Sequence, residues 1–436
     1  MQEPTWSRRA LLATAGVALA GCATGPGDNG TPTPAPDPPE IGVDAPTTVP
    51  ARDVEPTVLV ENLEIPWDIA VAPDGDLFIT ERVGRVNRFS SGQLEEVVTP
   101  DDAIDAGSVP PGAEESPWWV EGGEGGTLGA AVHPDYPDPA LLYVYYTARG
   151  DGEKRNRVSR FDVTAANPGA TEEVIIDDIP AHQVHNGGRI RFGPEGHLWV
   201  TTGTASYDKD QATARADDPG SLAGKVLRLT QSGDAAPGNP GFADPRVYTI
   251  GHRNPQGIVR LPGGAWLVNE HGGTGHDEIN RLVAGADYGW PNSPRGREKY
   301  VNTSGVHPPL ANTGESAWAP SGSVFYTGND VPSWSNRMLI GGLVSQQVIA
   351  ATIVPPDAEA PPTGEAGTAY TADWYDDAAT VVAHPLLRDV LGRVRHLEQG
   401  QNGALYAITS NRDGRAQGEF PRERDDVLVR LDATTG

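Results

Sequence analysis

Three segments of the sequence combine side chains that can do chemistry with glycines that let a ligand approach the backbone. They are residues 181–189 (AHQVHNGGR), 251–257 (GHRNPQG) and 269–280 (NEHGGTGHDEIN), and each lies beside a short β-type run. Glycine permits close backbone approach and positive φ angles. The His, Arg, Asn and acidic side chains supply donors, acceptors and a candidate base. Functional loops above a sheet have this composition, so we interpret the three segments as the active face of an enzyme.

His185 is the candidate catalytic base. It precedes Asn186, Gly187 and Gly188, a setting that lets the ring project from its loop. A neutral imidazole accepts a proton near physiological pH, as the oxidation of an alcohol or hemiacetal requires. The alternative is a histidine that is only hydrogen-bonded within its loop. The glycine setting and the nearby His182 favour the functional interpretation.

Arginines supply candidate anion-binding groups in two places. Arg253 beside Asn254 suits a ligand rich in carbonyl and carboxylate oxygens. Arg393 and Arg395 are two residues apart, so both point to the same side of a strand. Two like charges on one face repel each other unless an anion lies between them. That anion is either a ligand or, as the alternative, an Asp or Glu of the chain itself.

Residues 270–278 (EHGGTGHDE) form a candidate calcium loop. Calcium prefers carboxylate and carbonyl oxygens, and glycines let backbone carbonyls turn inward. The loop lacks the regular acidic alternation of an EF-hand, so its spacing alone is a weak metal signal.

A repeated combination of turn and strand predicts the elements that position these loops. Its copies begin near residues 72, 133, 193, 261, 322 and 400. Most are followed by a second apolar strand that ends in Arg and a hydrophobic residue, as in 85–89, 157–161, 225–229 and 427–431. A period of roughly 60 residues suits a four-stranded blade with long loops. Six blades closing into a ring give an all-β, six-bladed β-propeller of antiparallel sheets with the site at its central mouth. A row of β-sandwich domains is the alternative, and the absence of linkers between the units disfavours it.

Composition restricts the partners. The formal net charge of −26 argues against nucleic acid, because little basic surface would be left to neutralise phosphates. Excess acid suits a high-salt environment, in which screening weakens self-repulsion, so we expect a halophilic source. An acidic exported protein is the alternative.

The N-terminus predicts export. Residues 7–12 (SRRALL) are a twin-arginine start followed by an apolar stretch to residue 20, which is too short to span a bilayer stably. Cys22, the only cysteine, follows a lipoprotein-type sequence, so we predict a signal over 1–22, a lipid on Cys22 and attachment to the outer face of the cell membrane. Residues 23–54, rich in Pro, Thr, Gly and Asp, are predicted to be a disordered tether. The propeller is predicted over 55–436.

Ordered motifs along residues 56–431 carry a resemblance to a known family. They are 65–68 (IPWD), 80–82 (TER), 123–129 (GEGGTLG), 133–135 (HPD), the His185 loop, 251–257, 269–280, 287–291 (DYGWP), 318–322 (WAPSG) and 392–395 (GRVR). This pattern resembles the soluble PQQ-dependent aldose sugar dehydrogenases of the glucose/sorbosone dehydrogenase group. The resemblance implies a six-bladed propeller with PQQ and Ca²⁺ at the central mouth, an aldose substrate oxidised at C1 to a lactone, and an external electron acceptor.

The resemblance also implies roles for individual residues. His185 would take the hydroxyl proton while hydride passes to PQQ, and Arg253 would stabilise the charge that develops on the quinone oxygens. The remaining implied contacts are Glu124, Asn254, Arg393 and Arg395 to the cofactor, the carbonyls of Gly272 and Gly273 to the catalytic calcium, Glu278 and Tyr288 to a further structural calcium, and Trp318, more weakly, to the sugar.

Two departures from the family pattern keep other functions open. Thr204 stands where the family commonly has an acidic residue that orients the histidine, and either Asp208 or Asp210 is a candidate substitute. Val344 follows Leu343 where the family usually has a cation that reaches the cofactor. A non-catalytic sugar-binding propeller that has lost PQQ is therefore one alternative. A calcium-dependent lactone hydrolase is the other, although it would leave the Arg393 and Arg395 pair poorly explained.

Overall fold

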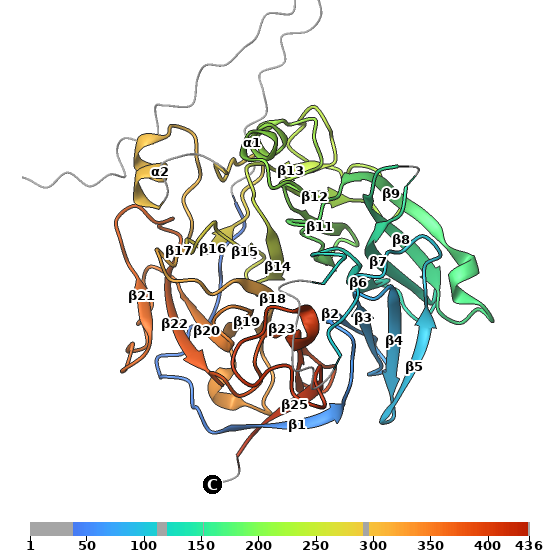
Figure 1. The fold of residues 1–436 in the computed structure, drawn as a ribbon. Coiled ribbons are helices and arrows are strands. Elements are labelled where there is room, and N and C mark those ends of the chain that lie inside the picture. Colours follow the sequence, from blue (N-terminus) through green and yellow to red (C-terminus); the bar gives the residue numbers. More distant parts are fainter. Residues whose placement is uncertain (1–37, 111–119, 151, 291–295, 435–436) are drawn as a thin grey trace, which may run out of the picture. The chain divides into compact units, whose positions relative to one another are not determined.

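Six antiparallel sheets follow one another along the chain in a computed structural model that describes residues 38–110, 120–150, 152–290 and 296–434 (Figure 1). Five sheets have four strands and the fifth sheet along the chain has five. The first strands of neighbouring sheets contact one another around the ring, and between the third and fourth sheets the main contact joins the second strand of one to the first strand of the next. The fold is therefore a six-bladed β-propeller, as the repeat predicted.

The strands of the first three blades run from the innermost strand outward in chain order. Blade one has β2 (Pro66–Val71), β3 (Leu77–Glu81), β4 (Arg85–Ser90) and β5 (Gln93–Val98); blade two has β6 (Thr127–Val132), β7 (Leu141–Ala148), β8 (Arg155–Asp162) and β9 (Glu173–Pro180); blade three has β10 (Ile190–Phe192), β11 (Leu198–Thr202), β12 (Lys225–Leu229) and β13 (Val247–Thr249).

The last three blades are also given from the innermost strand outward. Blade four has β14 (Pro255–Arg260), β15 (Trp266–Glu270), β16 (Glu278–Arg281) and β17 (Ala311–Asn312); blade five has β18 (Pro320–Tyr326), β19 (Arg337–Gly342), β20 (Gln347–Val354), β22 (Thr380–Leu386) and the outermost β21 (Thr368–Tyr370); blade six has β23 (Val394–Gln399), β24 (Leu405–Thr409), β25 (Leu428–Ala433) and β1 (Val54–Val60). The described helices are α1 (Lys209–Asp217) and α2 (Arg297–Asn302), with short 3₁₀ turns at Pro168–Thr171, Pro332–Trp334 and Asn411–Asp413.

The ring is closed by strands from the two ends of the described chain. β1 pairs with β25 in antiparallel register, with Val58 opposite Val429. This pairing completes blade six and covers an edge that would otherwise expose unpaired backbone groups. Middle strands such as β20 are buried along their whole length, because neighbouring blades cover both of their faces.

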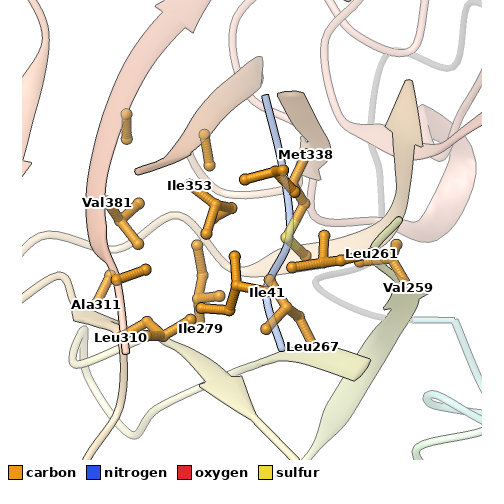
Figure 2. Close-up of a cluster of buried hydrophobic side chains, with 14 of the residues drawn as sticks. Ile41, Val259, Leu261, Leu267, Ile279, Leu310, Ala311, Met338, Ile353 and Val381 are labelled. Atoms are coloured by element: carbon orange, nitrogen blue, oxygen red, sulfur yellow. The ribbon is translucent and has the colours of Figure 1, made fainter. Parts of the chain in front are cut away.

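The predicted tether differs from the structure over its last part. Ile41 and Val43, two residues apart in an extended segment, are buried in the same hydrophobic cluster as Leu261 and Leu267, and Figure 2 shows Ile41 beside Leu267. Glu40 also forms a parallel β-bridge with Gly264. The folded unit therefore begins before residue 54, because the two apolar side chains lie on one side of the segment and pack into the hydrophobic core. The signal sequence, Cys22 and the tether up to residue 37 lie outside the described residues.

Buried charges tie the innermost strands together at the centre. Asp68 of β2 pairs with Arg189 and with Arg191 of β10, whose Nη1 lies 2.9 Å from Asp68 Oδ2. His396 of β23 lies 3.3 Å from the same carboxylate. Burial alone would raise the pKa of Asp68, but the charges of Arg189 and Arg191 hold it well below its ordinary value. These contacts join blades one, three and six. No helix among the described residues is long and apolar enough to cross a membrane.

Candidate active site

The candidate residues gather on one face because of the up-and-down order of strands within each blade. In an antiparallel blade, the loop that enters the first strand and the loop between the second and third strands emerge at the same end. Entry loops carry Glu124, His185 and Arg253, ahead of β6, β10 and β14. The repeated turns that revealed the propeller join first and second strands, so they lie at the opposite end.

A cavity of about 460 Å³ lies between these loops. Its size is within the range of small-molecule sites. The residues that line it come from blades two to six: Glu124, Val184, His185, Tyr207, Arg253, His271, Gly272, Ala319, Leu343, Val344, Gln346, Arg393, Arg415 and Gln417. We call it the central cavity.

His185 is held in the central cavity by a tightly built loop. Its backbone has φ +57°, a left-handed conformation that is uncommon for a residue with a side chain. Its backbone N–H donates to Glu124 Oε2 at 2.7 Å. Gly203 makes room for the loop, since a Cβ at that position would lie 2.0 Å from the His185 carbonyl oxygen. Glu124 and Gly203 therefore fix where the imidazole enters the cavity.

The environment of His185 keeps its ring neutral. Burial, followed by the positive charge of Arg253, lowers the pKa of His185 to about 4, although Glu124 acts in the opposite direction. Burial tends to raise the pKa of Glu124. In the acid range in which Glu124 titrates, the charges of protonated His185, of Arg415 and of protonated His271 outweigh burial and lower that pKa to about 2. The cavity therefore holds a neutral histidine beside an ionised carboxylate at neutral pH.

Thr204 contacts the ring at the position where the family pattern commonly has an acidic residue. Its Oγ1 lies 3.2 Å from His185 Nδ1. The two acidic residues that were candidate substitutes, Asp208 and Asp210, belong to helix α1 and its N-terminal cap. Asp208 caps helix α1 by accepting a hydrogen bond from the Gln211 N–H at 2.7 Å, and Asp210 is exposed in the first turn of the same helix.

Arg253 lines the edge of the central cavity. Its backbone N–H donates to Glu270 Oε2 at 2.9 Å, and its Nη1 donates to the His271 carbonyl at 3.2 Å. The guanidinium also lies 5.2 Å from the centre of the Trp290 ring. Asn254 is buried beside it, accepts a hydrogen bond from the Gly187 N–H at 3.1 Å and lies 3.5 Å from Glu124 Oε2. Asn254 thereby links the Arg253 loop to the His185 loop.

Arg393 and Arg395 do converge, and a carboxylate of the chain lies between them. Asp413 Oδ2 accepts from Arg393 Nη2 at 2.8 Å and lies 3.7 Å from Arg395 Nη2. The alternative interpretation of this pair is therefore correct in part. Arg393 still lines the central cavity. Arg395 lines a small cavity of about 20 Å³, which shares Glu124, His271, Leu343, Arg393 and Arg415 with the central cavity.

Positive charge exceeds negative charge across these two cavities. Their linings contain five arginines, namely Arg82, Arg253, Arg393, Arg395 and Arg415, and two carboxylates, Glu124 and Asp413. Five against two leaves an excess of three positive charges in a chain whose net charge is −26. Burial and then the charge of Arg82 lower the pKa of Arg395 to about 9. Like charges held together at this density favour an anionic ligand.

Arg415 and His271 are two of the lining residues that were not predicted from the sequence. Arg415, on the loop between β24 and β25, lies 3.5 Å from Glu124 Oε1. His271 lines both cavities, its ring Nε2 has no hydrogen-bond partner within the described part of the chain, and burial lowers its pKa to about 3. Arg415 stands in no β-type pattern, and His271 was noted only as part of the candidate calcium loop. No signal of type or spacing distinguished either residue.

Three of the four candidate calcium residues line a third cavity, of about 30 Å³, beside the central cavity. Gly272 and Gly273 both line it, and Gly272 also lines the central cavity. Glu278 lines it too, but its carboxylate is already bonded within the chain: Oε1 accepts from Asn312 Nδ2 at 3.0 Å and from the Tyr300 hydroxyl, and Lys299 Nζ lies 3.6 Å away. No cluster of three or more His, Cys, Asp or Glu side chains suited to a metal occurs in residues 38–434 apart from the undescribed gaps.

Tyr288 and Trp318 lie apart from the central cavity. The Tyr288 ring stacks on His252 at 4.5 Å, and its hydroxyl donates to the Arg281 carbonyl at 2.5 Å. Trp318 lines a separate cavity on blade five, while the next residue, Ala319, lines the central cavity.

Comparisons with known proteins agree with this architecture. The family model described as glucose / sorbosone dehydrogenase matches residues 63–418. The aldose sugar dehydrogenase of Escherichia coli is 27% identical over 400 residues, which cover 87% of this chain and 94% of that protein. The PQQ-bound aldose sugar dehydrogenase of Streptomyces coelicolor is 28% identical with a TM-score of 0.65, covering 88% of this chain and 99% of that one. A solved oxidoreductase (glucose dehydrogenase) of Thermus thermophilus is 34% identical with a TM-score of 0.66, covering 87% and 99%. The chain therefore belongs to the glucose/sorbosone dehydrogenase family.

Proposed function

We propose that this protein oxidises aldose sugars at C1 to lactones, with PQQ as its redox cofactor and Ca²⁺ beside it, and passes the electrons to an external acceptor. Family membership supports oxidoreductase chemistry on sugars. One observation carries the cofactor assignment: a neutral histidine lines the central cavity, and the central cavity and the small cavity beside it together have an excess of three positive charges.

The donor set fits PQQ. When bound, PQQ supplies an ortho-quinone that accepts hydride from the sugar carbon, and it carries three carboxylates. Arg393, Arg395 and Arg415 would hold carboxylates, and Glu124 and Asn254 would contact the polar rim of the ring system. The excess of three positive charges in the two cavities matches the three carboxylates of PQQ. This match explains how an acidic protein would retain an acidic cofactor.

His185 is the base in this proposal. If its Nδ1–H donates to Thr204 Oγ1, the lone pair of Nε2 remains to take the proton of the C1 hydroxyl. Because the ring is neutral, it needs no prior loss of a proton. Arg253 would stabilise the negative charge that develops on quinone oxygens, as a fixed cation in a water-poor site does.

Gly272 and Gly273 would supply carbonyl oxygens to Ca²⁺, which prefers hard oxygen ligands. Gly272 is a lining residue that the central cavity shares with the 30 Å³ cavity, so an ion held there would lie at the cofactor's edge. Arginines rather than carboxylates dominate the central cavity, and this charge favours the dehydrogenase over the lactone hydrolase.

Calorimetric titration of the protein lacking residues 1–22 with PQQ, in the presence and absence of calcium, tests the cofactor assignment. We expect one PQQ per chain, tighter binding with calcium and weaker binding in Arg393→Ala. An absence of PQQ binding at low and high salt would instead favour the sugar-binding propeller that has lost its cofactor.

We also propose export by the twin-arginine route and lipid attachment at Cys22, on the basis of residues 1–22. Cell fractionation compares the natural chain with Cys22→Ala. We expect the natural chain in the membrane fraction and the variant released. Equal distribution of the two would contradict the anchor. A halophilic source further predicts that the acidic surface makes the protein more stable as salt rises.

A further inference from the structure

A second cavity of about 280 Å³ lies on blade five and shares no lining residue with the central cavity. Trp318 and Tyr370 form its aromatic side, with ring centres 6.0 Å apart and planes at 89°. Ser345, Gln347, His384 and Arg388 are among its polar lining residues. We call it the blade-five cavity.

The two cavities are separated by one thin wall. Ala319 and Val344 line the central cavity, while their chain neighbours Trp318 and Ser345 line the blade-five cavity. The wall is held by backbone contacts, since the Trp318 carbonyl accepts from the Val344 N–H at 3.2 Å and from the Ser345 N–H at 3.3 Å. Val344 is half exposed, so it leaves the top of the wall open to solvent. A molecule with two linked rings that occupied both cavities would cross the wall at this residue.

The lining of the blade-five cavity has the chemistry of a site for an uncharged polyhydroxyl ligand. Arg388 is its one permanently charged lining residue among those described, and Nε of Arg388 already donates to Gln347 Oε1 at 3.2 Å. Aromatic rings with amide, hydroxyl and imidazole groups suit a sugar, which has an apolar C–H face and a rim of hydroxyls.

His384 adds an acceptor that the chain does not use. Its Nε2 lies 3.0 Å from the Pro362 carbonyl oxygen, so this nitrogen carries the proton and Nδ1 carries the lone pair. Nδ1 has no hydrogen-bond partner within the described residues, although His384 is only 4% exposed. Buried acceptors normally have a partner, and a ligand hydroxyl is a donor of the right kind.

We propose that the blade-five cavity binds a neutral sugar unit of a saccharide whose reducing end lies in the central cavity. The proposal rests on the proposed function and extends it to a substrate class: the preferred substrates are oligosaccharides with an aldose at the reducing end. The blade-five cavity then determines affinity for longer chains and leaves the chemistry at C1 unchanged.

Steady-state kinetics of the PQQ- and calcium-loaded protein test the substrate class with glucose, maltotriose and cellotriose. The variants are Arg388→Ala, which removes a group at the rim, and Ala366→Arg, which fills the cavity from its exposed side. Arg430→Ala, at an exposed arginine on β25, is the matched control. We expect KM for at least one trisaccharide to rise fivefold or more in both variants, with kcat and the KM for glucose unchanged. Equal changes for glucose and both trisaccharides, or no change, would overturn the proposal.

Binding without the cofactor separates this proposal from the proposed function. Calorimetry measures the binding of the same trisaccharides to the PQQ-free natural protein and to the same three variants. Binding that is lost in Ala366→Arg and kept in Arg430→Ala supports the blade-five cavity even if the protein oxidises no sugar. If oxidation of glucose is observed but neither trisaccharide binds more tightly than glucose, the dehydrogenase stands and the blade-five proposal fails.

Discussion

Nδ1 of His185 lies 3.2 Å from the hydroxyl oxygen of Thr204, where the entry loop of blade three meets the loop after its second strand. A hydroxyl can fix the orientation and tautomer of the ring, but it carries no charge to stabilise an imidazolium. Arg253 meanwhile disfavours the protonated ring. The imidazole of His185 is therefore oriented but only weakly basic in the absence of ligands.

Restoring a carboxylate beside His185 is expected to strengthen the base. In Thr204→Asp, the negative charge should raise the pKa of His185 and increase kcat, whereas Thr204→Val should lose the orienting bond and lower kcat by about ten- to a hundredfold. His185→Ala should lower kcat by at least about a hundredfold, and His197→Ala, on the hairpin turn of the same blade, is the control. Stopped-flow reduction of the loaded protein measures the chemical step. Unchanged rates in His185→Ala would exclude it as the base.

The ionisation of His185 should be visible directly. Because burial and Arg253 lower its pKa to about 4, the ring should stay neutral from pH 8 down to about pH 5 and gain its proton only below that range. An ordinary histidine would be half protonated near pH 6.5. Proton NMR of the cofactor-free protein, with the signal assigned from His185→Gln, measures the titration. A midpoint at or above pH 6.5 would contradict the described surroundings of the ring.

Arg415 should contribute to cofactor affinity although no sequence motif indicated it. It lines the central cavity, as does Val344, which has no charge to offer a carboxylate. Loss of one charge-assisted bond of about 1.5–3 kcal/mol in Arg415→Ala should weaken PQQ binding by about ten- to a hundredfold. Calorimetry compares this variant with Arg430→Ala, which should bind like the natural chain. Equal affinities in all three proteins would show that Arg415 does not contribute to PQQ binding.

Lys299 should compete with the predicted structural calcium for Glu278. Its ammonium lies 3.6 Å from Glu278 Oε1 and 4.7 Å from the centre of the Tyr300 ring, and both charged side chains are buried. Replacing it in Lys299→Met leaves the buried carboxylate without a counter-charge and should cost about 3–5 kcal/mol of unfolding free energy.

Calcium should recover part of that loss, so thermal unfolding of Lys299→Met should depend on calcium more strongly than that of the natural chain. Lys209→Met, at an exposed lysine of α1, is the control. If the natural chain and Lys299→Met gain equally from calcium, the ammonium does not occupy the site of the predicted structural calcium.

The propeller could be predicted because its signals are local. The turns at 73–75, 193–196 and 401–403 each join a first and a second strand, and such hairpins depend on a few adjacent residues. The segment that precedes β1 was harder to predict. Ile41 and Val43 stand in a proline-rich stretch, and only the surface offered by blades four and five makes them core residues.

The candidate site was predictable where glycine and polar residues coincide, as at His185 and Arg253. Placement relative to other blades was not predictable, because it depends on contacts between residues far apart in sequence. Asp413 between Arg393 and Arg395 could be stated only as an alternative. Trp318 was noted as a weak sugar contact, yet the sequence could not show that it faces a different cavity from its neighbour Ala319.

Reduction of an artificial dye by the protein lacking residues 1–22 tests the central claim most directly. The assay supplies a panel of aldoses and adds PQQ and calcium separately and together, at low and high salt. The proposed function predicts dye reduction that requires both additions and is lost in His185→Ala. Dye reduction that persists without PQQ, or no reduction by the fully supplied protein under any condition, would contradict it.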